Sequence, residues 1–470
     1  MINIATNLKY SIITFISRII SGSIVFILLA RLLTVSEFGL LSFGVSFAGL
    51  LTVLAEFGFS LMAQRDIPQN KFPLNDYISN ALFQKIFYSF LASVGAFVYL
   101  FFTYSGDSIR IGIIFLINAI LTSYSMYFFS VLRAKNLFKH ESLLSAFYSI
   151  FLGFTFVTLF FFNKNVLFLA IGLLVARLVQ FILICYFFFN TIEFSRFRLK
   201  MSIQKYFFKN SFSFGLHYII GVFYFTIDSQ LIFFYSGEEE LAIYQSFFKV
   251  ILIMLSVSDL LNNIFIPYFS SRIIKRDNLF DNLTLIANKA IIILGLVMFV
   301  FINLFAEDII TILYSEKYLS AMSIVLPLSF VLLFRICASF YAILLTISDH
   351  QGMRVLVVAI SLFVNFFLNI WLIPNYGFIG AAYVSMFTHL IMLILYFWFS
   401  SRFNSSLLSP DILLLLIITV FLIFLKSFYK LEFSFHTSLL MLLSWCCIVY
   451  IFIGNKQIRE MRSFFLERYF

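Results

Sequence analysis

Long apolar stretches separated by short polar turns run through this chain almost from end to end. About fourteen of them reach the roughly 20 residues that an α-helix needs to cross the hydrocarbon core of a bilayer. None shows the period-two alternation that outer-membrane barrel strands carry. We therefore predict an all-α polytopic membrane protein. The stretches lie approximately at 10–33, 39–62, 79–104, 110–132, 142–162, 166–190, 210–235, 241–269, 284–306, 320–346, 355–374, 378–400, 411–429 and 437–453.

The composition supports this prediction. Of 470 residues, 62% are hydrophobic and 11% are charged, whereas a soluble domain is about half apolar and about a quarter charged. A soluble fold of this size cannot bury so much apolar surface and keep a polar coat. A soluble enzyme, a nucleic-acid-binding protein and a disordered scaffold are therefore excluded.

The positions of the basic residues set the expected orientation. With the N-terminus placed in the cytoplasm, the cytoplasmic loops and tails hold 20 of the 32 Lys and Arg residues and the opposite loops hold 6. Cytoplasmic loops of membrane proteins carry such an excess, so we expect both termini inside and an even number of spans. The net charge of +10 then faces the anionic inner leaflet.

Loop length and weak internal similarity suggest two homologous six-helix lobes. The entry at Glu37–Leu40 is similar to Glu240–Ile243, and the turn at 163–165 to the turn at 375–377, with nearly the same offset. We expect an N-terminal lobe at 1–190 and a C-terminal lobe at 210–400. A cytoplasmic linker at 191–209 would join them as a helix lying on the membrane surface, and two extra helices with a basic tail would occupy 401–470.

Nine charged residues lie inside the apolar stretches, six positive and three negative. A charge at the bilayer centre costs roughly 2.5–3.5 kcal/mol, so these side chains must form pairs or face a water-filled cavity. Lys85 and Lys289 lie near the cytoplasmic end, where their side chains can extend to the membrane surface. The nine residues together carry a net charge of +3, and this imbalance indicates a cationic cavity and an anionic passenger.

Four cations are candidates for that cavity. Arg18 and Lys249 lie about two turns inside their helices and are the main candidates for phosphate contacts; the alternative is a salt bridge to Asp228 or Glu56. Arg177 and Arg335 lie near the middle of the sixth and tenth stretches and are candidates for lining the cavity.

The three acidic residues inside the apolar stretches are interpreted separately, and two of them have two open interpretations. Asp228 and Asp259 either pair with the lysines or bind a coupling proton or sodium ion. Glu56 is expected to pair with Arg18 or Arg65 rather than to bind substrate. No metal-binding, nucleotide-binding or catalytic-triad motif is present. We therefore expect no cofactor, and any uphill transport would be coupled to a proton gradient, a sodium gradient or the membrane potential.

Three motifs resemble those of the oligosaccharide flippases of the multidrug/oligosaccharidyl-lipid/polysaccharide exporter superfamily. The motifs are Ala30–Leu40, Glu56–Phe59 followed by Gln64–Asp66, and Tyr376–Ala382. The resemblance implies two six-helix lobes in a MATE-like V shape around a cationic cavity lined by the first, second, seventh and eighth helices. The chain differs from the commonest O-antigen flippase pattern in having about fourteen predicted helices instead of twelve.

The resemblance implies a bacterial inner-membrane flippase for an undecaprenyl-pyrophosphate-linked oligosaccharide of the O-antigen or capsule type. The repeat unit would move from the cytoplasmic to the periplasmic face by alternating access. The lipid bilayer, a polysaccharide polymerase and a chain-length regulator are the other expected partners, with no nucleic acid. A lipid II or teichoic-type flippase remains an alternative. A membrane polymerase or glycosyltransferase is disfavoured because outward loops such as 307–319 are short. A drug exporter is disfavoured because a cationic passenger requires an acidic cavity.

Overall fold

The computed structural model describes most of the chain, and the described part is helical without a β-strand. Eight of its helices are long and apolar enough to cross a membrane, and shorter apolar helices lie at Gly22–Leu32 and Leu413–Ile423. Each predicted apolar stretch contains described helical residues, so the predicted all-α membrane fold is confirmed. The described residues are 22–162, 165–192, 197–270, 278–348, 350–402, 410–429 and 436–445, with isolated positions 10, 14, 17, 194 and 449.

The chain divides into two compact units, Met1–Ala242 and Ile243–Phe470, and each is described here by itself. Their boundary lies inside the long helix α8, a few residues beyond a break in it. The lobes expected at 1–190 and 210–400, the linker at 191–209 and the appendix at 401–470 stay predictions. The helices of unit 1 are α2 (Val35–Glu56), α3 (Phe59–Asp66), α4 (Leu74–Thr103), α5 (Gly106–Ala134), α6 (Phe138–Phe162), α7 (Val166–Thr191) and the first part of α8 (Met201–Ser270).

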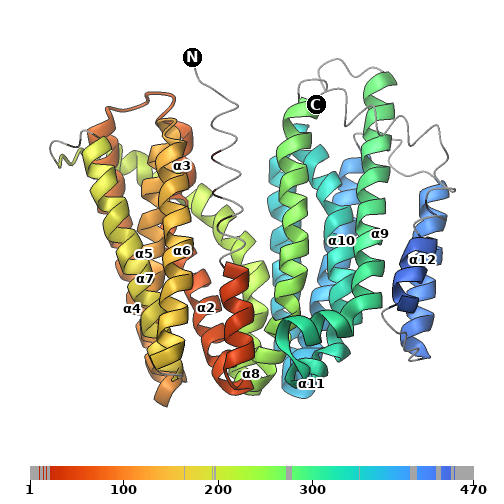
Figure 1. The fold of residues 1–470 in the computed structure, drawn as a ribbon. Coiled ribbons are helices and arrows are strands. Elements are labelled where there is room, and N and C mark those ends of the chain that lie inside the picture. Colours follow the sequence, from red (N-terminus) through yellow and green to blue (C-terminus); the bar gives the residue numbers. More distant parts are fainter. Residues whose placement is uncertain are drawn as a thin grey trace. The chain divides into compact units, whose positions relative to one another are not determined.

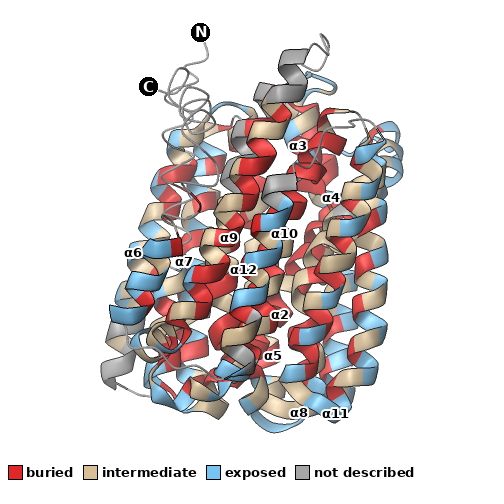
Figure 2. Ribbon diagram, turned by 90° about the vertical axis from the view of Figure 1, so that its right-hand side faces the viewer, coloured by how far each residue is buried: buried red, intermediate tan, exposed pale blue. Residues whose placement is uncertain are grey.

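Helix α2 is the most enclosed helix of unit 1. It packs against α4, α5 and α7, and most of its length is buried, whereas little of the most apolar part of α4 is buried (Figures 1 and 2). A capping box starts the helix. The Glu37 amide donates to the Thr34 hydroxyl at 3.3 Å, and the Thr34 amide donates to the Glu37 carboxylate at 3.0 Å.

The predicted stretch 39–62 is two helices instead of one. Phe57 (φ 45°) and Gly58 (φ 80°) adopt the left-handed conformation and separate α2 from α3. A Cβ at Gly58 would lie 2.7 Å from the backbone nitrogen of Gly215 on α8. Glycine is required here both by its dihedral angles and by this close approach. The break lets α3 lie at the uppermost end of unit 1 in Figure 1.

One end of unit 1 is strongly basic, and we call it the basic end. Contacts between α3, α5 and the first turns of α4 and α8 hold it together, among them Gln64 to Ser130 and Arg65 to Tyr206. In the predicted orientation it faces the cytoplasm. Its cations are Arg65, Lys71, Arg133, Lys135, Lys139, Arg198, Lys200, Lys205 and Lys209.

The described residues of the linker expected at 191–209 are partly helical, and the position of the linker on the membrane surface stays a prediction. Residues 197–200 are not helical, and α8 begins at Met201. The Arg198 amide donates to the Ser79 hydroxyl and the Lys200 amide to the Asn80 side-chain oxygen, at 3.2 and 3.0 Å. These contacts with α4 satisfy backbone groups that a surface helix would have bonded internally.

Unit 2 holds the rest of α8, α9 (Asn278–Tyr314), the 3₁₀ turn η1 (Glu316–Ala321), α10 (Met322–Ile347), α11 (Gln351–Ser401) and α12 (Pro410–Phe428). Two of the long helices contain a break. Helix α9 breaks at Phe305, near the end of the predicted stretch 284–306, and α11 breaks at Gly377, between the predicted stretches 355–374 and 378–400. A core of α9, α10 and α12 side chains also contains Trp445, whose indole N–H donates to the Thr419 hydroxyl at 3.2 Å.

Large apolar side chains cover the outside of both units. Phe101, Phe102 and Phe154 in unit 1 and Trp371 and Phe363 in unit 2 are each at least 64% exposed. Such a surface is unsuited to water and suited to lipid. The burial pattern therefore agrees with a multi-pass membrane protein (Figure 2).

Candidate functional site

A buried acid and a buried base lie near each other where α2 ends. Glu56 is fully buried, and its carboxylate accepts the backbone N–H groups of Gly58 and Ser60 at 2.8 and 2.5 Å. The left-handed turn at Phe57 and Gly58 presents these N–H groups to the carboxylate. Glu56 thus caps the start of α3, where a negative charge is favourable.

Lys85 of α4 supplies the cation of this site. It is fully buried, and its ammonium donates to the Ala55 carbonyl at 3.3 Å and to the Ser123 hydroxyl at 2.6 Å. It also lies 5.2 Å from the centre of the Tyr124 ring. The expectation that Lys85 extends to the membrane surface is wrong, because polar groups of α2 and α5 hold the ammonium inside unit 1. Lys289 of unit 2 is also buried, at 6% exposure.

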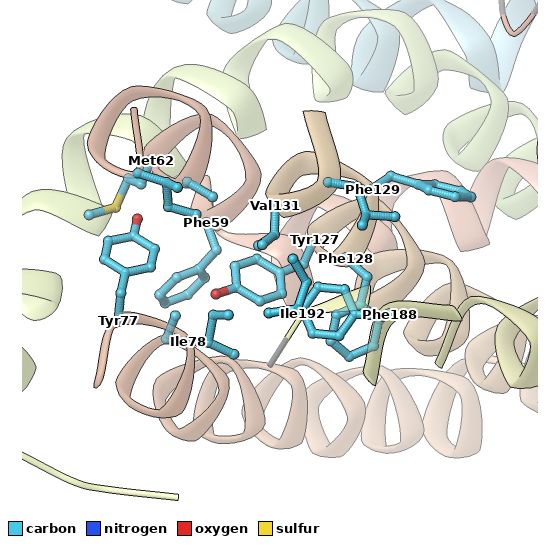
Figure 3. Close-up of a cluster of buried hydrophobic side chains, with 14 of the residues drawn as sticks. Phe59, Met62, Tyr77, Ile78, Tyr127, Phe128, Phe129, Val131, Phe188 and Ile192 are labelled. Carbon is cyan, nitrogen blue, oxygen red and sulfur yellow. The ribbon is translucent and has the colours of Figure 1, made fainter. Parts of the chain in front are cut away.

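An aromatic cluster closes the basic end of unit 1 around this pair. Helices α3, α4, α5 and α7 contribute to it, and Tyr127 lies at its centre with its hydroxyl on the side of Phe59 (Figure 3). The Tyr127 hydroxyl and the Ser60 hydroxyl are buried without a hydrogen-bond partner. The cluster excludes water from the Glu56–Lys85 pair, which strengthens their attraction.

The expected pairing of Glu56 with Arg65 is not present, because Arg65 has other partners. Its Nε donates to the Asp66 carboxylate at 2.8 Å, and its Nη2 donates to the Tyr206 hydroxyl at 2.7 Å. The hydrogen bond that Arg65 donates to Asp66 raises the pKa of Arg65, which keeps the guanidinium charged. Lys71 donates to the same hydroxyl at 2.8 Å, and that hydroxyl donates to Asp66 at 3.0 Å.

The predicted cavity residue Arg177 lies on α7 and is half-buried. Its Nη1 donates to the Gln180 side-chain oxygen at 2.6 Å, and its guanidinium lies 4.3 Å from the centre of the Tyr148 ring. A cation over an aromatic ring is stabilised without a countercharge. In these contacts an amide and an aromatic ring hold the Arg177 guanidinium inside the spanning region.

Asp228 is buried on α8, at 3% exposure, between other buried polar residues of unit 1. The neighbouring Gln230 amide donates to the Ser46 hydroxyl of α2 at 2.7 Å. The facing sides of α2 and α8 are therefore polar at this level. This placement agrees both with Asp228 pairing with a lysine and with Asp228 binding a coupling proton or sodium ion.

Unit 2 holds Lys249, Arg335 and Asp259. Lys249, on the second part of α8, and Arg335, on α10, are both half-buried. The Arg335 Nη1 donates to the Met392 sulfur at 2.9 Å. The side chain of Asp259 lies outside the described residues, as does Arg18 of unit 1. The predicted site residues are thus divided between the two units, and their roles stay predictions.

Sequence reasoning missed a polar stripe on α11. Ser361, Asn365 and Asn369 follow one another at four-residue spacing, and each is at most 1% exposed. The Asn369 amide donates to the Asn365 side-chain oxygen at 3.1 Å. Polar residues on one helix face inside an apolar stretch were the available signal. Among the described residues, no group of three or more His, Cys, Asp or Glu side chains is arranged to hold a metal.

The fold and these buried charges define a polytopic membrane protein. Residues 7–273 match the family described as "Polysaccharide biosynthesis protein". Since this range covers more than half of the chain, the protein belongs to that family. The resemblance drawn from the three motifs is therefore confirmed.

One similar sequence and two similar structures place the chain further. An uncharacterized membrane protein of Methanocaldococcus jannaschii is 29% identical over 147 residues, which span 31% of this chain and 28% of that protein. The lipid II flippase MurJ in an inward closed conformation is 20% identical, with a TM-score of 0.74 over 95% of this chain and 99% of that one. An inward-facing MATE multidrug transporter is 14% identical, with a TM-score of 0.62 over 85% and 95%. At these identities the two structures establish the shared fold alone.

Proposed function

We propose that this protein is a flippase. It moves a polyprenyl-diphosphate-linked oligosaccharide repeat unit, of the O-antigen or capsule type, from the cytoplasmic to the outer face of a bacterial inner membrane. The observation that carries the proposal is the combination of a polysaccharide biosynthesis family with a fold shared along nearly the whole chain with a lipid II flippase. Both termini lie in the cytoplasm in this account.

The charges inside the spanning region support an anionic passenger. Arg177 and Arg335 are half-buried and contact neutral groups, an amide and an aromatic ring for one and a thioether for the other. A guanidinium inside the spanning region is suited to attract a phosphate group. Arg18 and Lys249 are the proposed phosphate contacts. Asp228 and Asp259 either pair with cations or bind a coupling proton or sodium ion.

Lipid II is the second candidate substrate, because the MurJ structure covers nearly all of this chain. A reconstituted assay separates the candidates. Full-length protein in vesicles is supplied with fluorescent lipid-linked sugars on one face, and the fraction that reaches the other face is measured by a membrane-impermeant quencher. We expect transfer of a lipid-linked oligosaccharide without change in its length. Chain extension in this assay would indicate a polymerase and contradict the proposal.

The same assay tests the phosphate contacts. Arg18→Ala and Lys249→Ala should each slow transfer by about tenfold, since each removes a charge-assisted contact. Protein yield and thermal stability should stay near those of the wild type. Lys139→Ala, which removes an exposed lysine of the basic end, is the matched control and should transfer at the wild-type rate. Full transfer by both cavity variants would overturn the phosphate-contact assignment.

A further inference from the structure

Two cations of the basic end converge on one tyrosine. The Tyr206 hydroxyl accepts one hydrogen bond from Arg65 and one from Lys71, and it donates to Asp66. A phenol has one proton to give and two lone pairs, so the hydroxyl is fully used. The Arg65 Nη2 atom lies 2.7 Å and the Lys71 Nζ atom 2.8 Å from the same Tyr206 oxygen. The distance between the two nitrogens therefore cannot exceed the sum of these two distances.

Among the described residues of unit 1, Asp66 is the carboxylate that forms a salt bridge with this pair of cations. Asp66 is almost fully buried, and it pairs with Arg65 through the Nε atom. No carboxylate of the described residues lies within salt-bridge distance of Lys71. Two like charges this close repel each other, and an anion that bridges them removes that repulsion.

Aromatic side chains hold both cations in place before any ligand arrives. The Arg65 guanidinium lies 4.6 Å from the centre of the Phe214 ring, and the Lys71 ammonium lies 4.4 Å from that of the Tyr206 ring. Phe72 packs against Tyr206 with the ring centres 5.1 Å apart. Cations fixed in this way lose less conformational entropy on binding.

Hydrogen-bond donors remain on the exposed side. The Arg65 side chain is 35% exposed, and Lys71 is exposed. Arg65 uses Nε and Nη2 in the contacts above, which leaves Nη1, and Lys71 has two further ammonium protons. Lys209, one turn along α8 from Tyr206, is also exposed.

We propose that Arg65 and Lys71, held by Tyr206, bind the phosphate groups of a lipid diphosphate at the basic end of unit 1. Exposed apolar side chains on the same part of α8, Met201 at 72% and Phe208 at 68%, offer contact to the lipid chain. This site lies outside the predicted cavity residues and would capture the headgroup before transport. The choice of a polyprenyl diphosphate as ligand rests on the proposed function.

Native mass spectrometry of the full-length protein in detergent tests this site, with undecaprenyl diphosphate as the probe. Lys71→Gln and Tyr206→Phe should each weaken binding by about five- to tenfold, because one removes a cation and the other removes the group that positions both. Lys139→Gln removes the same charge from the same end and should change the affinity less than twofold. Equal affinities of Lys71→Gln and Lys139→Gln would overturn the proposal.

Two further probes define the recognised chemistry. Inorganic diphosphate should compete with the lipid probe, and phosphatidylglycerol should bind more weakly, since it carries one phosphate charge. Absence of competition, or equal binding of phosphatidylglycerol, would contradict a diphosphate site. Lys71→Gln should raise the substrate concentration for half-maximal transfer in the vesicle assay and leave the maximal rate unchanged. A protein that binds the probe through Lys71 but transfers no lipid-linked sugar would keep this site and refute the flippase function.

Discussion

At the residue scale, the buried charges divide into two kinds. Arg177 and Arg335 are half-buried inside the spanning region, where they donate to the Gln180 side-chain oxygen and to the Met392 sulfur. Glu56 and Lys85 lie together in a closed aromatic surrounding. The first kind suits an anionic passenger, and the second fixes the corner between α2 and α3.

The Glu56–Lys85 pair gives a prediction about stability. Lys85→Met removes the buried ammonium near the Glu56 carboxylate and leaves the Ala55 carbonyl and the Ser123 hydroxyl without its hydrogen bonds. A buried polar group left without a partner costs about 1–3 kcal/mol. We expect a large drop in the unfolding temperature of the purified protein. The double variant Glu56→Gln with Lys85→Met should recover part of this loss, because neither charge remains. The exposed Lys139→Met is the control, and an equal effect of Lys139→Met and Lys85→Met would contradict the assignment.

Sequence reasoning located Glu56 and Lys85 but not their relation. The apolar stretches identified both as charges inside the membrane. Which charges meet depends on the left-handed turn at Phe57 and Gly58 and on the packing of α4 beside it. A hydropathy pattern carries no information on such a turn. The same holds for Arg65, whose partners Asp66 and Tyr206 were not anticipated.

At the element scale, glycines set how closely helices approach. The break of α8 at Gly237 (φ 85°) brings Glu238 against the start of α2, where the Ser36 hydroxyl donates to the Glu238 carboxylate at 2.8 Å. A Cβ at Gly39 would lie 1.9 Å from the Glu238 carbonyl oxygen. The apolar stretches located α2 and α8 in the sequence, but close contacts of this kind come from three-dimensional packing.

Gly39 and Gly49 make a matched test on α2. Alanine normally stabilises a helix by up to about 1 kcal/mol over glycine. Gly49→Ala should follow this rule, since its Cβ would have its nearest neighbour at 3.8 Å. Gly39→Ala should lower the unfolding temperature and reduce transport, because the backbone of Glu238 cannot yield as a side chain can. Similar unfolding temperatures for both variants would show that α2 and the α8 break are not in tight contact.

At the scale of the whole molecule, the sequence predicted most of the architecture. The apolar stretches correspond to helices throughout the described residues. The details that it did not predict are those set by tertiary contacts, such as the non-helical form in which α4 holds residues 197–200. The V-shaped arrangement of the lobes, the orientation in the membrane and the coupling ion stay predictions.

The predicted orientation has a direct test. Reporter fusions placed after Lys209 and Arg276 should be active in the cytoplasm, and a fusion after Glu239 should be active outside it. The physical reason is the concentration of Lys and Arg at the basic end of unit 1 and in the other loops that are predicted to face the cytoplasm. A fusion after Arg110, on the poorly charged side, serves as a second external marker. Reversed activity at any of these sites would contradict the topology.

The central claim is that the chain transports a finished lipid-linked unit and does not build or extend it. The surface polysaccharide of a strain that lacks this gene tests the claim most directly. The account predicts that no repeat units reach the surface and that lipid-linked units accumulate on the cytoplasmic face. Single repeat units on the surface without long chains would show that export is intact, and the protein would then act in polymerisation.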